Sequence, residues 1–261
     1  MSTPHVQYEE TGAVAYVTFN RPEARNAMSW EMYEALGNLC QRAEDTPGIR
    51  VLILRGAGGK AFVAGTDISQ FREFRSSRDG IAYEERLDAI IERLETVTIP
   101  TIAQINGVAA GGGCAIAAAC DLRVCTPTSR LGVPVAKTLG NCLSAANYSR
   151  LLDLVGSTRL KEMLYTGRLI QANEALAAGL VNQVVEPKDL DSAVLSLAQT
   201  IAANAPLTIQ ATKEMIRRIQ VQRRLAAAEG HDLITTCYTS LDFKHGVAAF
   251  LAKEKPQWQG K

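Results

Sequence analysis

Apolar positions in the first two thirds of the chain follow two alternating periods. Short runs rich in β-branched and aromatic residues predict strands, and apolar residues three or four positions apart predict helices between them. Strands that alternate with helices predict an α/β fold with crossovers and a layered sheet. The predicted strands are residues 13–19, 50–56, 100–105, 121–125 and 182–186, and the predicted helices in this part are residues 30–45, 81–97 and a small-residue helix that begins at the glycines 111–113.

Two stretches of this part have no regular pattern. The start of the chain, which includes His5, is expected to be disordered, and the polar residues 69–80 are expected to form a mobile loop. Ser29 is expected to cap the helix over residues 30–45, which ends before Pro47.

After about residue 144 the pattern becomes almost entirely helical. Successive helix patterns cover residues 144–156, 157–167, 172–181 and 190–204, and the tail from Pro206 continues in the same way. We therefore expect an α/β core over residues 1–200 and a helical C-terminal region over residues 201–261.

Composition narrows the possible partners. The 261 residues are 47% hydrophobic and carry a formal net charge of +1, so neither nucleic acid nor an anionic membrane is an expected partner. No apolar stretch reaches the ~18 residues that span a bilayer. The start lacks the pattern of a secretory signal, so the cytoplasm is the expected compartment. The six cysteines form no CxxC pair and are expected to be reduced, and no metal-ligand spacing occurs.

The three glycines at the start of a helix are unusual, because each glycine costs roughly 0.5–1 kcal/mol relative to alanine there. Free N–H groups and the helix dipole at such a turn can hold a phosphate or an oxyanion. The spacing does not match the phosphate-binding fingerprints. Close packing of the helix on the sheet is an equally good explanation from the local pattern.

A second turn offers the same chemistry. Gly65 precedes Thr66 and Asp67 after another predicted strand. An N–H group of this turn would converge with that of Gly112 if the two strands are neighbours in the sheet. Two such donors form an oxyanion hole, which stabilises an enolate or a tetrahedral oxyanion.

Five segments, in order along nearly the whole chain, together resemble the crotonase superfamily, also called the enoyl-CoA hydratase/isomerase family. They read "NRPEARNAMS", "AFVAGTDI", "INGVAAGGGCAIAAACDLRV", "LYTGRLIQANEALAAGLVNQVVE" and "GVAAFLAKEKPQWQGK". The resemblance implies a crotonase-like spiral of ββα units whose helical C-terminal region serves trimerisation, and trimers that commonly pair into hexamers.

The resemblance also implies an acyl-CoA substrate, with coenzyme A as part of the substrate rather than a separate cofactor. Its thioester carbonyl would lie between the N–H groups of Thr66 and Gly112, where a side chain at Gly112 would crowd it. The residues expected to contact the substrate are Arg25, Ala27, Ala64, Asp67, Ile68, Gly111, Val135, Asn141 and Cys142.

The chain departs from the family at the two glutamates that hydratases use for water and the α-proton. Ala115 follows the GGGC segment and Val135 follows Pro134, so both carboxylates are missing. The next segment also differs, and it is expected to place Asn141, Cys142, Ser144 and Asn147 near the acyl end of the pocket.

Three explanations remain open for the missing carboxylates. Asp67, Glu84 or Glu85 could replace them, although Asp67 is also expected to cap its turn and the two glutamates to lie on a solvated face. Asn141 or Cys142 could support another reaction such as thioester hydrolysis, or the protein could bind acyl-CoA without converting it. The expected function is hydration or dehydration of an enoyl-CoA, with isomerisation, hydrolysis and binding alone as alternatives.

The remaining histidines and the basic residues add little. His231 and His245 are expected at a surface or an interface. A basic run in the tail is expected to be a solvated helix face, with attraction of the CoA phosphates as the alternative. The residues of this run are Lys213, Arg217, Arg218, Arg223 and Arg224, and Lys253 and Lys255 are candidates of the same kind.

Overall fold

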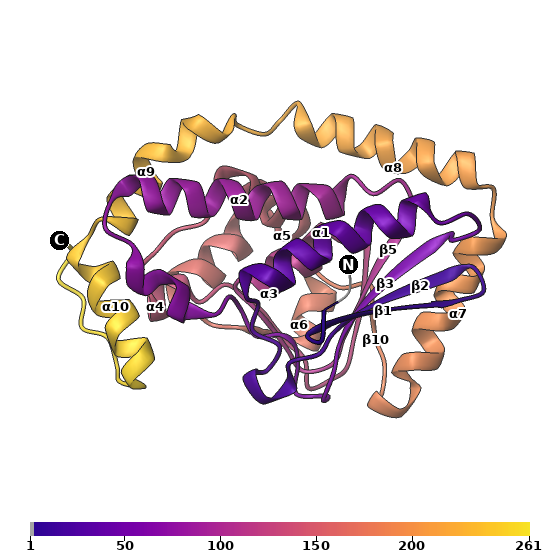
Figure 1. Cartoon of the computed structure of the whole chain (residues 1–261), viewed down its shortest axis with the longest axis horizontal. Helices are drawn as coiled ribbons and strands as arrows, with labels where there is room; N and C mark the ends of the chain where they lie inside the picture. Colours follow the sequence, from indigo (N-terminus) through magenta and orange to yellow (C-terminus); the bar gives the residue numbers. More distant parts are fainter. Residues whose placement is uncertain (1–2) are drawn as a thin grey trace.

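The computed structural model describes residues 3–261, so the first two residues of the expected core lie outside the described residues. A six-stranded sheet forms the centre (Figure 1), with the strand order β1-β2-β3-β5-β7-β10. The strands are parallel except for β1, which pairs antiparallel with β2. Their bounds are β1 Val6–Thr11, β2 Val14–Phe19, β3 Val51–Gly56, β5 Thr101–Ile105, β7 Leu122–Cys125 and β10 Gln183–Val184.

A second sheet contains four short strands in the order β4-β6-β8-β9. Their bounds are β4 Ala61–Val63, β6 Val108–Ala110, β8 Arg130–Gly132 and β9 Ile170–Gln171. Each repeat of the chain places its first strand in the large sheet and its second in the small one, and then continues into a helix. The repeats are β3–β4–α2, β5–β6–α3 and β7–β8–α4, which confirms the predicted spiral of ββα units.

Both faces of the central sheet are buried, which explains the continuous apolar runs of its strands. Along β3, Val51 and Ile53 pack with α7 (Leu190–Ala203), while Leu52 and Leu54 face the main core. That core is completed by α1 (Trp30–Asp45), α2 (Ser77–Glu95) and α3 (Gly112–Ala119). As predicted, Ser29 caps α1, since its side chain accepts a hydrogen bond from the Met32 N–H.

The predicted mobile loop over residues 69–80 is wrong. Residues Ile68–Glu73 form a 3-10 helix, η2, and α2 already begins at Ser77. Phe71 is buried, with its ring centroid 4.8 Å from that of Tyr83, so burial of aromatic side chains orders a segment that is polar by composition.

The predicted disorder at the start of the chain is also wrong. β1 pairs with β2 from Val6↔Phe19 to Thr11↔Val14, and the His5 carbonyl accepts a hydrogen bond from the Asn20 N–H. The hydrophobic pattern does not predict this strand, because β1 lies at the edge of the sheet and Val6 is its one fully buried residue.

The rest of the chain is helical, as predicted. α5 (Ala145–Thr166) contains a break at Gly156, where φ is 71°, so it joins the two predicted helices. The expected boundary at residue 200 falls inside α7, which packs on the central sheet. In Figure 1, α8 runs along the outside beyond α2, and α10 lies at the opposite end of the molecule from α7. The remaining helices are α4 Val135–Thr138, α6 Ala172–Ala177, α8 Pro206–Val221, α9 His231–Tyr238 and α10 Leu241–Ala252.

No single helix among residues 3–261 has the length and apolar character needed to cross a membrane. The segment Pro187–Ala203 and α8 meet that test only when taken together, and they are bent by 104°.

Candidate active site

The two predicted turns meet at one edge of the small sheet. β4 and β6 are parallel neighbours with Val63 opposite Ala109, so the residues that follow them leave the sheet side by side. A Cβ atom on Gly111 would lie 3.7 Å from the Cα of Gly65. The predicted proximity of the two glycine turns is therefore present in the structure.

Several N–H groups at this junction have no acceptor within residues 3–261, and those of Thr66 and Gly112 are among them. The amide that follows Thr66 and the one that precedes Gly112 are engaged, since the Asp67 N–H donates to the Met28 carbonyl at 2.9 Å and the Gly111 N–H donates to the Gly132 carbonyl at 3.0 Å. Gly112 is also the first residue of α3, where N–H groups point out of the helix and the dipole is positive.

The three glycines are required for three different reasons. Gly111 has a φ of +53°, a conformation that L side chains rarely adopt. A Cβ on Gly112 would lie 2.2 Å from the hydroxyl of Tyr33, and one on Gly113 would lie 2.0 Å from the Val63 carbonyl oxygen. At Gly112, then, the chain's own tyrosine excludes a side chain, whereas we expected the thioester to do so.

A chain of hydroxyl groups fixes the turn at Thr66. Its Oγ1 shares hydrogen bonds with the hydroxyl of Tyr33 at 2.9 Å and with that of Tyr83 at 3.0 Å. Burial raises the pKa of both tyrosines, so their hydroxyls remain neutral.

A pocket of about 110 Å³ opens over the two free amides. Much of its wall is apolar, with Leu87 of α2, Leu139 and Leu143 of the following loops, and Phe250 of α10. The predicted site residues that line it are Ala64, Thr66, Ile68, Gly111, Gly112, Val135 and Asn141.

Four predicted contact residues do not line this pocket: Arg25, Ala27, Asp67 and Cys142. Arg25 and Ala27 belong to the adjoining loop, where the Arg25 carbonyl accepts a hydrogen bond from the Ala64 N–H. Asp67 pairs with Arg21 at 2.9 Å and caps η2 through the Ser69 N–H, as expected for its turn. The Arg21 and Ser69 partners hold the pKa of Asp67 below its usual value.

Ala115 and Val135 both line the pocket, so the two positions that lack carboxylates present apolar groups. The structure supplies one other carboxyl group there, from Glu84 of α2. Glu84 is 3% exposed, which corrects the expectation of a solvated face. Its neighbour Glu85 does face solvent, where it lies 3.4 Å from His231.

Two groups from different elements hold Glu84. The Tyr238 hydroxyl of α9 donates to its Oε1, and the Ser144 N–H donates to its Oε2 at 3.2 Å. Asn141 Nδ2 donates to the same tyrosine oxygen at 3.1 Å, and the Oδ1 of Asn141 is buried without a partner among the described residues. Burial raises the pKa of Glu84 to about 8 despite these hydrogen bonds.

Cys142 does not fit the role of a nucleophile. Its thiol is buried beside Cys237, and that sulfur contact together with burial raises the pKa of Cys142, so the thiolate is disfavoured. All six cysteines are free.

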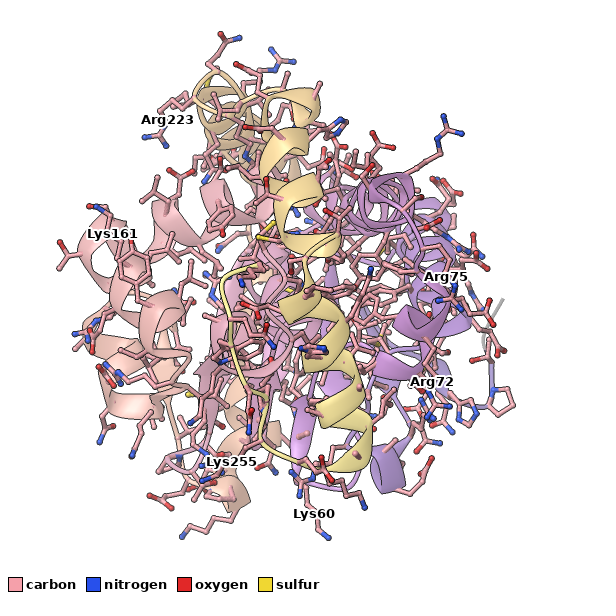
Figure 2. All side chains as sticks on the ribbon, turned by 90° about the vertical axis from the view of Figure 1, so that its left-hand side faces the viewer. Lys60, Arg72, Arg75, Lys161, Arg223 and Lys255 are labelled. Atoms are coloured by element: carbon pink, nitrogen blue, oxygen red, sulfur yellow. The ribbon has the colours of Figure 1, made fainter. Side chains whose placement is uncertain are left out.

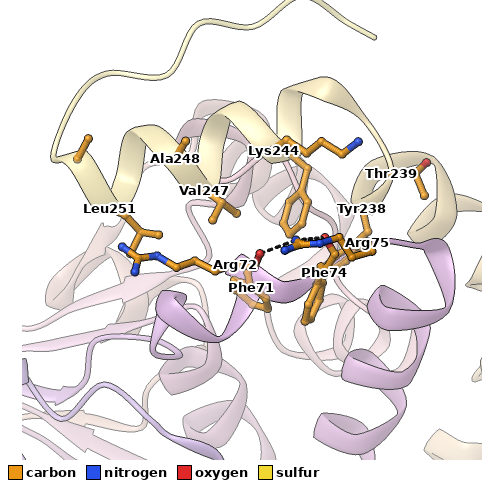
Figure 3. A pocket seen from close by; sticks show the side chains of 12 residues that line it. Phe71, Arg72, Phe74, Arg75, Tyr238, Thr239, Lys244, Val247, Ala248 and Leu251 are labelled. Carbon is orange, nitrogen blue, oxygen red and sulfur yellow. Dashed lines mark hydrogen bonds between the residues drawn. The ribbon is translucent and has the colours of Figure 1, made fainter.

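A larger groove of about 660 Å³ lies next to the pocket, between η2 and α10 (Figure 3). The two cavities share Phe71. Arg72, Arg75 and Lys244 line the groove around an apolar floor, and the Arg75 guanidinium donates to the carbonyls of Arg72 and Phe74. Figure 2 looks onto the end of the molecule that carries α10, with Arg72, which lines the groove, and Lys255, which follows α10, on either side of that helix.

The basic run of the tail is only in part the solvated face that we expected, because Arg218 and Arg223 are exposed whereas Lys213, Arg217 and Arg224 are partly buried. Lys213 pairs with Asp121 at 2.7 Å, and Arg224 pairs with Glu95. Arg217 and Arg218 both pair with Glu214, and Arg223 pairs with Asp153. These cations therefore serve ion pairs within the chain.

Sequence reasoning missed the tyrosines that organise the site, Tyr33, Tyr83 and Tyr238. They lie on three helices far apart in the chain, and each fits the apolar face of its helix equally well as ordinary core. Residues 3–261 contain no cluster of His, Cys, Asp and Glu side chains able to hold a metal ion.

Comparison with known proteins gives consistent results. The family model described as enoyl-CoA hydratase/isomerase matches residues 9–261. The chain is 36% identical to the short-chain-enoyl-CoA hydratase of Clostridium acetobutylicum over 98% of its own length and 97% of that protein.

Solved structures resemble the chain over its full length. An enoyl-CoA hydratase/carnithine racemase from Magnetospirillum magneticum is 33% identical with a TM-score of 0.81, covering 100% of this chain and 97% of that one. A methylmalonyl-CoA decarboxylase complexed with 2S-carboxypropyl-CoA is 31% identical with a TM-score of 0.90, covering 100% of both chains.

Proposed function

The chain belongs to the enoyl-CoA hydratase/isomerase family, and we propose that it binds a CoA thioester with its carbonyl oxygen between the N–H groups of Thr66 and Gly112. The observation that carries this proposal is the pair of unengaged amides beneath the pocket. Donors fixed in advance at a site that excludes water stabilise an oxyanion without reorganisation. The N-terminus of α3 adds positive potential at the same place. The bound thioester therefore ionises to its enolate more easily than in water.

Hydration of a short 2-enoyl-CoA, or the reverse dehydration, is the reaction that we propose. It is supported by relatives that are named hydratases and by the size of the pocket. A volume of about 110 Å³ is smaller than the ~150 Å³ cavity that holds benzene. This small volume beside the two amides favours a short acyl chain, and coenzyme A enters as part of the substrate without a further cofactor.

Cations near the mouth of the pocket supply the counter-charge that the CoA phosphates need. Arg25 is exposed on the loop beside Ala64, and Arg72 and Lys244 line the adjoining groove. We assign the nucleotide end of CoA to this side of the molecule and not to α8, whose cations already form ion pairs.

Decarboxylation of a short α-carboxyacyl-CoA is the second candidate. Loss of CO₂ leaves the electron pair of the broken bond in the enolate, so the reaction needs no base to remove a proton. The apolar groups at Ala115 and Val135 fit that requirement, and the TM-score of 0.90 to a methylmalonyl-CoA decarboxylase favours it.

The assay offers crotonyl-CoA and methylmalonyl-CoA to the full chain. It follows the absorbance of the conjugated thioester for the first substrate and CO₂ release for the second. Replacing the peptide bond before Thr66 by an ester removes that N–H, and we expect turnover to fall by roughly 10²–10³-fold. Tight binding of both substrates without conversion of either would instead identify a non-catalytic acyl-CoA binder.

A further inference from the structure

Glu84 lines the same pocket as Gly112 and Ala115, yet it lies on α2, away from both positions where the family carries its glutamates. We propose that Glu84 is the catalytic acid that delivers a proton to the α-carbon of the thioester enolate. This inference rests on the proposed function, because it requires an enolate held at Thr66 and Gly112.

The placement of α2 connects Glu84 to the thioester site. The preceding residue, Tyr83, shares a hydrogen bond with Thr66 Oγ1 at 3.0 Å, and both Tyr83 and Glu84 line the pocket. The carboxyl group therefore lies on a helix that is anchored directly to one of the two amide donors. Ala115 and Val135 contribute no competing proton donor to the pocket.

Two hydrogen bonds fix the orientation of the carboxyl group. Tyr238 donates to Oε1 and the Ser144 N–H donates to Oε2, so the plane of the group is set from α9 and from the start of α5. Asn141 in turn orients the tyrosine hydroxyl. Tyr238 is thus a positioning residue, and it does not itself line the pocket.

The charge state of Glu84 suits an acid. Its pKa is raised to about 8, chiefly by burial and further by the charge of Asp88, so the protonated form predominates at neutral pH. An acid with a pKa near the working pH is an efficient proton donor. The titratable groups that surround it are Tyr33 of α1, Tyr83 and Asp88 of α2, Cys142 before α5, Tyr148 of α5 and Tyr238 of α9.

In hydration, the oxygen of water bonds to the β-carbon, and the π electron pair moves to form the enolate. The enolate then takes the proton of Glu84 to make the new α C–H bond. The proton lost by the added water returns to the carboxylate, so the residue is regenerated. In decarboxylation the same proton transfer follows loss of CO₂, and solvent reprotonates Glu84.

The other acidic groups do not meet these requirements. Asp88 accepts hydrogen bonds from the Ser144 hydroxyl and from Asn147, and it does not line the pocket. Asp67 is engaged by Arg21, and Glu85 faces solvent.

The test uses butyryl-CoA, a saturated thioester, and measures exchange of its α-protons in heavy water by mass spectrometry. Exchange runs the proposed transfer in both directions and does not depend on which reaction the enzyme performs. We expect the wild-type chain to catalyse exchange and Glu84→Gln to slow it by roughly 10²–10⁴-fold. The matched control is Glu85→Gln on the same helix, which should exchange at the wild-type rate.

Binding of butyryl-CoA, measured by calorimetry, separates the possible failures. Wild-type exchange that persists in a folded Glu84→Gln variant overturns the inference and leaves the proposed function standing. Wild-type protein that does not bind butyryl-CoA contradicts the proposed function instead, whereas wild-type protein that binds it without exchange overturns the inference about Glu84. If Glu84→Gln does not fold, Glu84→Asp replaces it in the test, because it keeps a carboxyl group. We expect Glu84→Asp to retain part of the wild-type exchange rate. A folded Glu84→Asp variant without any exchange counts against the inference.

Tyr238→Phe tests the positioning role. Removing the donor leaves the carboxylate less stabilised, so the inflection of the exchange rate with pH should move upward. An unchanged inflection would exclude Tyr238 from that role.

Discussion

At the scale of single residues, position 112 must meet two structural requirements, and only glycine meets both. Its N–H must face the pocket, and its Cα must pass within reach of the Tyr33 hydroxyl, where a Cβ would lie at 2.2 Å. The Tyr33 hydroxyl cannot simply withdraw, because it shares a hydrogen bond with Thr66, which provides the second amide.

We expect Gly112→Ala to destabilise the fold by about 1–3 kcal/mol, the usual cost of overpacking. Tyr33→Phe should relieve much of this loss in the double variant, because the ring carbon that remains lies at 3.5 Å. Denaturant unfolding of the two single variants and the double variant measures the coupling. Strictly additive losses would contradict a clash with Tyr33.

The pH dependence follows from Glu84. Its pKa of about 8 means that the proton donor is present below that pH and is lost above it. Hydration of an enoyl-CoA should therefore slow as the pH rises through about 8, because it needs the acid form. Exchange of α-protons should accelerate through the same inflection, because it needs the carboxylate to remove a proton. If the rates of hydration and of α-proton exchange changed in the same direction with pH, Glu84 could not be both the proton donor in hydration and the base in exchange.

The sequence predicts only some of the residues that form the site. Ala115 and Val135 can be read directly from their places in the motifs, so the missing carboxylates were evident. The burial of Glu84 was not, because it depends on Tyr238, 154 positions away, which supplies its hydrogen bond. Local pattern places Glu84 and Glu85 on the same helix and does not say which of them turns inward.

At the scale of elements, the site depends on the pairing of two short strands. β4 and β6 contain three residues each, too few to show a period, yet their parallel pairing brings Gly65 beside Gly111. The inner strands of the large sheet, β2, β3, β5 and β7, were predictable because they are largely buried on both faces. The short strands of the second sheet were not predictable from local pattern, and only the family resemblance, with its ββα units, implied them.

Helices α2, α5 and α8 are linked through one carboxylate. Glu95, near the end of α2, accepts hydrogen bonds from Arg150 of α5 at 3.1 Å and from Arg224, just beyond α8, at 2.7 Å. Both arginines hold its pKa below the usual value. These side chains are about 3–13% exposed, so their charges are largely removed from water.

Glu95→Ala should therefore cost about 3 kcal/mol in unfolding free energy, because it leaves the nearly buried Arg224 unpaired and leaves Arg150 with Asp88, at 3.9 Å, as its remaining ion-pair partner. Glu214→Ala is the matched control, since Glu214 pairs two arginines on a half-exposed helix face, where solvent screens the charges, and its loss should cost much less than that of Glu95. Urea unfolding compares the two variants. Similar losses would show that Glu95 is not a structural link.

At the scale of the whole molecule, α8 and the turn after it present an apolar face to the outside. Its exposed side chains are Leu207, Met215, Ile216, Ile219, Val221 and Leu225. The family resemblance predicts trimers and hexamers, and a surface of this kind is suited to contact with further copies of the chain. Assembly stays a prediction, because a single chain does not display it.

Sedimentation velocity should therefore give the mass of a trimer or a pair of trimers. The double variant Ile216→Asp, Ile219→Asp should sediment as a smaller species, while Lys188→Asp at an exposed site should leave the mass unchanged. If the wild-type chain sediments as a monomer, the apolar face of α8 does not mediate contact between copies of the chain.

The proposed chemistry depends most on two amides that polarise one thioester carbonyl. Difference infrared spectroscopy of bound butyryl-CoA, labelled with carbon-13 at that carbonyl, observes the bond directly. We predict a shift of its stretching band to lower frequency on binding, and partial reversal of the shift when the peptide bond before Thr66 is an ester. A bound thioester whose band stays at its solution frequency would contradict the account.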